Sequence, residues 1–139
     1  MKKWLMTAAL AMIMAVSLIG CRAGGKAATQ AKKSGTADGM MIGLSMNTQT
    51  NPFFVSVQQG VKDAASKYGI EIVATDAQDN PAIQAKDIEN LIAMKPAAII
   101  VDTCDSDAII PSIEACNEAG IPVFTMDRKS NGGEVVAHI

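Results

Sequence analysis

The sequence predicts an α/β fold in which a parallel sheet is flanked by helices. Short apolar runs without polar alternation recur along the chain, as at residues 97–101, and such runs are typical of strands covered on both faces. Stretches with the apolar spacing of amphipathic helices separate these runs, and Pro52 and Pro81 stand where two of the helices would begin. Because strands that alternate with helices are joined by crossovers, the strands are expected to run parallel.

The first expected strand, at residues 40–46, leads into a helix that begins at Pro52 with Asn51 as its N-cap. Phe53 and Phe54 then fall in the first helical turn. Adjacent helical residues point about 100° apart, so at least one ring should face a binding mouth rather than the core. The later strands are expected at residues 70–75, 97–101, 121–126 and 134–139, and the later helices between Pro81 and Pro96 and from about 106 or 107 to 119.

The first 38 residues differ in composition from the rest of the chain. Residues 1–21 have a positive start, a long apolar run and a final cysteine, which is typical of an export signal, and their end resembles the lipobox of bacterial lipoproteins, with Cys21 as the lipidated residue. A signal anchor or an ordinary secretory signal is the alternative, although the run is slightly short for a span of about 20 residues. Residues 22–38 are polar and small and predict a flexible tether, which leaves residues 39–139 as the folded lobe.

Charge and motif content exclude several classes of function. All 14 acidic residues lie at or after Asp38, whereas only six of the 12 basic residues do, and an acidic body without a basic cluster argues against a nucleic-acid partner. The sequence has no phosphate-binding loop, metal-spaced cluster or nucleophile elbow, and its one histidine, His138, lies in an apolar run. We therefore expect no enzyme, cofactor or metal site, and we expect Cys104 and Cys116 to be unpaired.

Polar side chains follow the end of each expected strand. Ligands of parallel α/β sheets bind outside the carboxyl ends of the strands, so these residues should gather at one ligand-binding edge: Asn47, Asp76, Asp102 and Asp127. Helix caps and turns are the alternative role, which we expect for Asp76, Asp79, Asp105 and Asp107. No helix follows Asp127 and Arg128 at once, so we expect this pair to bind ligand, with a structural ion pair as the alternative.

Several motifs together look like the ribose-binding proteins, which are substrate-binding components of ABC transporters with the type I periplasmic binding protein fold. The resemblance extends from residue 40 to residue 139. It is carried by Asn51-Pro52-Phe53-Phe54-Val55, Asp105-Ser106-Asp107-Ala108, Ile121-Pro122-Val123, and Asp127-Arg128 followed by Gly133-Glu134-Val135-Val136 and His138-Ile139. The resemblance implies a Rossmann-like lobe, one of two similar lobes that close on a sugar, and it implies that the lobe is incomplete here.

The resemblance also implies roles for individual residues. Asn51 would hydrogen-bond the sugar, Phe53 and Phe54 would supply the aromatic pair, and Asp127 with Arg128 would hold ring hydroxyls. The residues themselves agree, because a sugar needs carboxylate acceptors, amide or guanidinium donors and an aromatic surface for its C–H face.

Two positions depart from the pattern of the ribose binders. Asn47 stands where serine is common, and Asp102 stands where asparagine is common. Ribose, another pentose, a hexose or a related polyol-like ligand therefore all stay open.

The expected partners follow from the resemblance: a ribose-like monosaccharide, ABC permease and ATPase subunits, a chemoreceptor, and the membrane through lipid on Cys21. The protein is expected to be exported, either lipid-anchored at the outer face of the cell membrane or periplasmic. Two alternatives are a single-domain exported flavodoxin-like protein of unknown ligand and a non-functional truncated fragment. A lactose-repressor-type regulator would begin with a helix-turn-helix instead of the export signal at residues 1–21.

Overall fold

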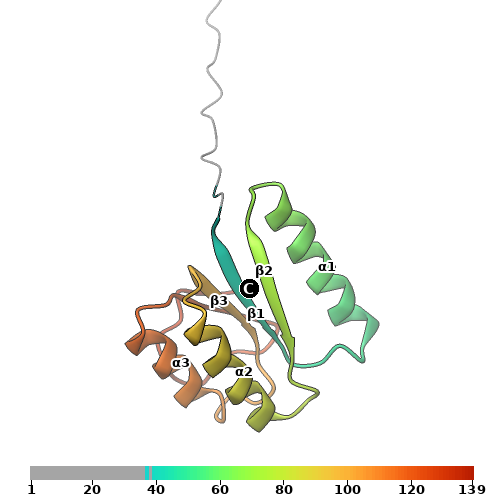
Figure 1. Ribbon diagram of the computed structural model, residues 1–139. Coiled ribbons are helices and arrows are strands. Elements are labelled where there is room, and N and C mark those ends of the chain that lie inside the picture. Colours follow the sequence, from blue (N-terminus) through green and yellow to red (C-terminus); the bar gives the residue numbers. More distant parts are fainter. Residues whose placement is uncertain (1–36, 38) are drawn as a thin grey trace, which may run out of the picture. The chain divides into compact units, whose positions relative to one another are not determined.

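The computed structural model describes residue 37 and residues 39–139. Five strands form one parallel sheet in the order β2-β1-β3-β4-β5 (Figure 1). The strands are β1 Met41–Met46, β2 Glu71–Asp76, β3 Ala98–Asp102, β4 Val123–Met126 and β5 Ala137–His138, and the helices are α1 Pro52–Ser66, α2 Pro81–Ala93 and α3 Ile110–Glu118. The α/β fold with a parallel sheet is confirmed. The expected signal segment with Cys21, together with residues 22–36 and 38 of the expected tether, lies outside the described residues.

An asparagine followed by a proline begins both α1 and α2. Asn51 accepts a hydrogen bond from the Phe53 backbone N–H at 2.9 Å, and Asn80 accepts one from the Ala82 N–H at 2.9 Å. The next residue in each case is the first of the helix, where proline has no N–H to leave unpaired. The predicted cap at Asn51 is confirmed, and it depends only on residues next to one another in the sequence.

The third helix begins later than residue 106 or 107, so that prediction was wrong. Asp105 Oδ1 accepts hydrogen bonds from the backbone N–H groups of Asp107 and Ala108 at 3.0 and 2.8 Å, and residues 106–109 form a turn. Pro111 cannot donate to the carbonyl four residues earlier, so a regular helix cannot run through it from Asp107. α3 therefore begins at Ile110, where Pro111 falls in the first helical positions.

The fifth strand is shorter than the expected 134–139. The Asn117 side chain of α3 accepts from the Glu134 N–H at 2.8 Å and donates to the Glu134 carbonyl at 3.0 Å. Residue 134 is thus held by a helix rather than by the sheet, and β5 pairs with β4 through Ala137 and His138.

The main hydrophobic core lies between the sheet and the neighbouring helices α2 and α3 (Figure 1). Leu91 and Ile113 of these helices and Ile99 of β3 are almost fully buried, at 1%, 1% and 0% exposure. Gly43 of β1 permits the close approach of α2, because a Cβ there would lie 3.1 Å from a methyl carbon of Leu91. Each fully buried aliphatic side chain contributes about 1.5–3 kcal/mol, so this face of the sheet carries much of the stability.

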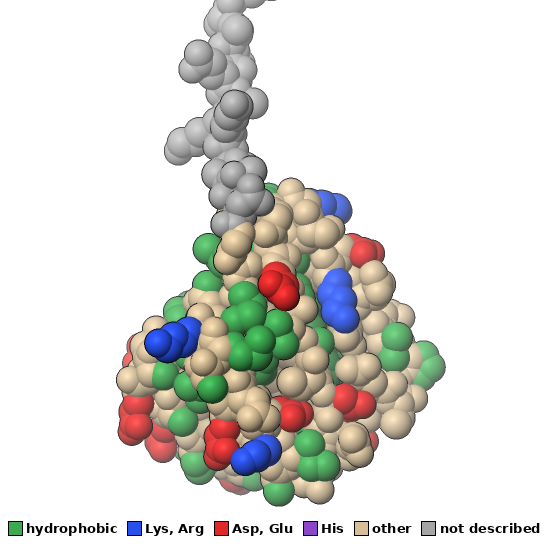
Figure 2. Space-filling model, viewed as in Figure 1, with side chains coloured by type: hydrophobic (Ala, Val, Ile, Leu, Met, Phe, Trp, Pro, Cys, Tyr) green, Lys and Arg blue, Asp and Glu red, His purple; other side chains and the backbone are tan. Residues whose placement is uncertain are grey.

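Charged side chains of both signs lie on the face of the molecule shown in Figure 2. On the face shown in Figure 2, the Lys and Arg side chains are separate from one another and interspersed with acidic ones. Among the described residues, no helix is long and apolar enough to cross a membrane.

Candidate ligand-binding site

The strand order places a switch point between β1 and β3. The chain leaves β1 toward β2 and later leaves β3 toward β4, so the two connections diverge at the carboxyl ends of these strands, where open α/β sheets typically bind ligands. Asn47 follows β1 and Asp102 ends β3, and the Asn47 backbone N–H donates to Asp102 Oδ2 at 3.3 Å. The structure thus brings two predicted site residues together at the position where α/β sheets bind ligands.

Asn47 and Asp102 are buried, with 7% and 0% of their surface exposed. They therefore lie beneath the surface of the edge instead of forming its outer wall. Within the part of the chain that the structure describes, Asn47 Oδ1 and Asp102 Oδ1 have no hydrogen-bond partner, and the same holds for the hydroxyls of Thr75 and Thr103. All four atoms belong to the carboxyl ends of strands or to the residues that follow them, so unused hydrogen-bonding capacity collects at this edge.

Burial raises the pKa of Asp102 from its usual value of 3.8 to about 6. The hydrogen bond from the Asn47 N–H opposes this rise, the negative charges of Asp127 and Asp79 add to it, and the positive charge of Arg128 reduces it. Asp102 is therefore mostly ionised at neutral pH and becomes neutral below about pH 6, so mild acid changes the charge beneath the site.

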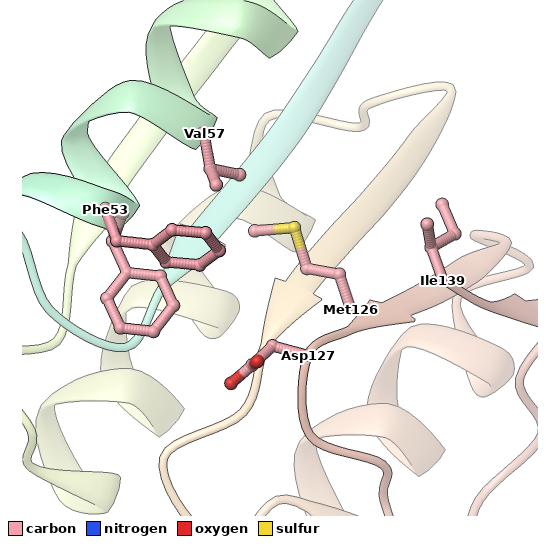
Figure 3. Close-up of a pocket in the computed structure, with 6 residues that line it drawn as sticks. Phe53, Val57, Met126, Asp127 and Ile139 are labelled. Atoms are coloured by element: carbon pink, nitrogen blue, oxygen red, sulfur yellow. The ribbon is translucent and has the colours of Figure 1, made fainter.

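A pocket of about 300 Å³ opens between the start of α1 and the end of β4 (Figure 3). Its walls are Phe53, Phe54, Val57, Met126, Asp127 and Ile139. The two phenyl rings pack edge to face, with centroids 5.2 Å apart and planes at 72°. Both rings line this pocket, and the expectation that at least one of them faces a bound ligand stays a prediction. Figure 3 shows the Met126 side chain directed toward the rings, with the Asp127 carboxylate beside the opening.

Asp127 and Arg128 form no ion pair with each other within the described residues, where the salt bridge present is Lys86 to Glu89. Asp127 has a left-handed backbone, with φ 60°, and its N–H donates to the Ile139 carbonyl at 3.1 Å. Arg128 turns to the neighbouring loop, where Nη1 donates to the Cys104 carbonyl. The structural ion pair is therefore absent, which leaves the Asp127 carboxylate and most of the guanidinium free for a ligand.

The remaining predicted residues take several roles. Asn51 uses its Oδ1 as the α1 cap, so the side-chain group it can offer a ligand is the Nδ2 donor. Asp76 accepts from the Gln78 N–H at 3.0 Å and is a turn former, as expected. Asp107 lies in the turn at residues 106–109, as expected, and its Oδ1 also accepts from Asn131 Nδ2 at 2.7 Å, which links two loops. Asp79 lies in the left-handed region with φ 57°.

The cysteines and the histidine that the sequence singled out do not line the pocket. Cys104 and Cys116 are free, as expected. His138 forms a hydrogen bond with Thr125 Oγ1 at 3.0 Å between β5 and β4. The described part of the chain holds no group of three metal-ligating side chains.

Sequence reasoning missed four residues of this edge: Val57, Met126, Ile139 and Gln84. The first three line the pocket and were read as packing or strand residues. Gln84 is 1% exposed and bonds to three segments of the edge. A signal for Gln84 exists in the sequence, because it is a polar residue in register with Ile88 and Leu91 on the apolar side of its helix.

The strand order with its switch point and the aromatic pocket at the carboxyl edge of the sheet define a Rossmann-like lobe. The sequence model of the periplasmic binding protein domain family matches residues 42–139, and the chain belongs to this family. The flavodoxin-like alternative has the same strand order but is not supported by this match.

Individual relatives point the same way. The chain is 39% identical over 102 residues to the ribose import binding protein of Bacillus subtilis, and 39% identical over 98 residues to that of Escherichia coli; these segments cover 73% and 70% of this chain and 33% of each relative. A Caulobacter myo-inositol binding protein, solved with myo-inositol bound, is 31% identical with a TM-score of 0.68 over 72% of this chain and 34% of its own. The chain thus spans about a third of the length of the relatives it matches.

Proposed function

We propose that this chain is the sugar-binding lobe of an extracytoplasmic solute-binding protein of an ABC transporter, with ribose or a related monosaccharide as its ligand. The observation that carries the proposal is the pocket of about 300 Å³ in which Phe53, Phe54 and Asp127 meet at the carboxyl edge of the sheet. Relatives named as ribose import binding proteins and a neighbour with bound myo-inositol support a neutral polyhydroxylated ligand. This activity is binding, not catalysis.

The chemistry of the pocket matches such a ligand. The phenyl rings offer an apolar surface to the C–H face of a sugar, and the Asp127 carboxylate accepts hydrogen bonds from hydroxyls. Arg128 keeps N–H donors beyond the one that binds the Cys104 carbonyl, and Asn51 offers Nδ2. Hydroxyls both donate and accept, so this mixed set suits them better than it suits an anion or a cation.

The test is calorimetric titration of the full-length gene product with ribose, allose and myo-inositol. Arg128→Ala should weaken binding of the preferred sugar by about 1.5–3 kcal/mol, the range for hydrogen bonds to charged groups, without loss of the fold. Lys129→Ala is the matched control, because it removes an exposed neighbouring cation. Unchanged affinity together with lost stability in Arg128→Ala, or no binding of any of the three sugars by the wild type, would reject the proposal.

The partners and the location extend the same proposal. The protein would deliver sugar to ABC permease and ATPase subunits and to a chemoreceptor, and it would be attached to the outer face of the cell membrane by lipid on Cys21. The apolar run that ends at Cys21 supports the anchor. In a bacterial host, Cys21→Ser should release the protein or leave it unprocessed; equal fractionation of wild type and variant, with no fatty-acid label on either, would exclude the lipid.

A further inference from the structure

Gln84 is a buried polar side chain on an otherwise apolar face of α2. It is 1% exposed and lies in register with Ile88 and Leu91, which are each 1% exposed within the core. A carboxamide in this position is costly unless both its donor and its acceptor are paired. The hydrogen-bond partners of Gln84 therefore indicate why a polar side chain occupies this buried position.

All hydrogen-bond partners of the Gln84 side chain within the described residues lie at or beside the ligand edge. Its Nε2 donates to the Asp102 carbonyl at 2.7 Å and to Ser45 Oγ at 3.3 Å, and its Oε1 accepts from the Cys104 N–H at 2.9 Å. One side chain thus joins β1, the end of β3 and the loop that follows β3. The Asp102 and Cys104 bonds hold that loop at both sides of residue 103.

The loop held by Gln84 is the one that anchors Arg128. Cys104 is fixed through its N–H by Gln84, and its carbonyl accepts the hydrogen bond from Arg128 Nη1. Arg128 is exposed and forms no salt bridge among the described residues, so the Cys104 carbonyl is its side-chain anchor in this structure. The path from Gln84 to the guanidinium consists of two hydrogen bonds and one residue.

We propose that Gln84 is a positioning residue for ligand binding: it fixes the loop at Cys104 and thereby the guanidinium of Arg128. This inference rests on the proposed function in that Arg128 contacts the sugar. A side chain at this position must both donate and accept, which glutamine does and a hydrocarbon or a carboxylate does not. Without Gln84, the Cys104 carbonyl loses its fixed place and the guanidinium loses its orientation.

The experiment combines two readouts on the full-length gene product. The first is the NMR signal of the Arg128 guanidinium, assigned by its loss in Arg128→Lys, and the second is sugar affinity by calorimetry. Gln84→Met keeps the volume and removes the hydrogen bonds, so it should move or broaden the Arg128 signal and weaken sugar binding about tenfold, which corresponds to one charge-assisted hydrogen bond.

Gln84→Glu is a conservative variant whose hydrogen-bonding capacity depends on pH. A neutral carboxyl group has one O–H donor and an acceptor oxygen, enough to replace the bonds to the Asp102 carbonyl and from the Cys104 N–H, whereas a carboxylate only accepts. In this variant, the Arg128 signal should resemble the wild type at low pH and Gln84→Met at high pH. The wild type measured over the same pH range accounts for titration of the neighbouring Asp102.

Ile88→Val is the matched control, since it loosens α2 one turn further along the same buried face without touching the edge. It should lower stability but leave both readouts at wild-type values. An unchanged Arg128 signal in Gln84→Met, or the same affinity loss in Ile88→Val, would overturn the positioning role. If the wild type bound no sugar, the proposed function would fail, while the Arg128 signal would still decide the role of Gln84.

Discussion

The core beneath α2 and α3 and the carboxyl edge of the sheet are built in opposite ways. The core is a cluster of apolar side chains, all almost fully buried: Ile88, Leu91, Ile99, Val101, Ile109, Ile113, Cys116, Ile121 and Val123. The edge instead combines buried polar atoms that lack partners, a carboxyl with a raised pKa, and left-handed backbone at Gln78, Asp79 and Asp127. The contrast indicates that the core supplies the stability, whereas the edge keeps polar groups available for the proposed ligand.

Features of the edge persist because the core holds them in place. A left-handed residue other than glycine costs about 1–2 kcal/mol, and an unpaired buried polar group costs about 1–3 kcal/mol. Such costs are tolerated where the surrounding structure over-determines the conformation. Substitutions in the two regions should therefore differ in sign as well as in size.

The largest effect is expected in the core. Leu91→Ala should lower the free energy of unfolding by about 2–5 kcal/mol, because it leaves a cavity beneath the sheet. Gly43→Ala in the same chain should restore part of the loss, since its new Cβ would occupy space beside residue 91. Urea unfolding of the single and double variants measures both values, and strictly additive losses would show that the two positions are not coupled.

At the edge, Asp102→Asn should stabilise the protein at neutral pH. Because the folded-state pKa of Asp102 is raised from 3.8 to about 6, the folded protein holds its proton more tightly, and stability falls as pH rises through about 6. Removal of the charge should recover up to about 3 kcal/mol at pH 7.5 and much less at pH 4.5.

Unfolding curves at both pH values, with the exposed Asp63→Asn as a control, test this expectation. If Asp102→Asn instead destabilised the protein equally at pH 4.5 and pH 7.5, the carboxylate would be needed as a hydrogen-bond acceptor, and its burial would not be a cost to the folded state.

The smallest expected change in stability comes from replacing a residue with left-handed backbone at either end of the sheet. Lys95 follows α2 with φ 55°, and Asp127 follows β4 with φ 60°. Glycine at either position should raise the free energy of unfolding by about 0.5–1 kcal/mol. It relieves the strain of the left-handed backbone, and its larger conformational entropy in the unfolded chain offsets part of that gain. Asp127→Gly should also abolish sugar binding, whereas Lys95→Gly should leave it unchanged; equal affinities in the two variants would remove the distinction between the carboxyl edge and the opposite end of the sheet.

The sequence was sufficient for two of the three helix starts, where the structure depends on neighbouring residues. The starts of α1 and α2 follow from an asparagine and a proline side by side, and the order of strands and helices follows from apolar spacing. The start of α3 was misplaced because the acidic turn at Asp105 has the composition of a helix start, whereas Pro111 decides where regular bonding can begin.

The arrangement of the edge could not be read in the same way. Asn47 and Asp102 were recognised as polar residues after strands, but their burial depends on packing between segments 55 residues apart. The anchor of Arg128 on the Cys104 carbonyl likewise depends on where two loops meet. Sequence patterns indicate which residues reach the edge, whereas depth and orientation arise from contacts between distant segments.

The edge-to-face pair at the start of α1 bears on how a ligand would be captured. Phe53 and Phe54 are presented by a helical turn that Asn51 caps, and their centroids are already 5.2 Å apart. Side chains that are ordered before binding lose little rotamer freedom when a ligand arrives, so little of the interaction energy is consumed in ordering them. Encounter with a sugar face should then be limited by diffusion and lobe movement rather than by rearrangement of the rings, and residence time should depend on the polar groups that close around the hydroxyls.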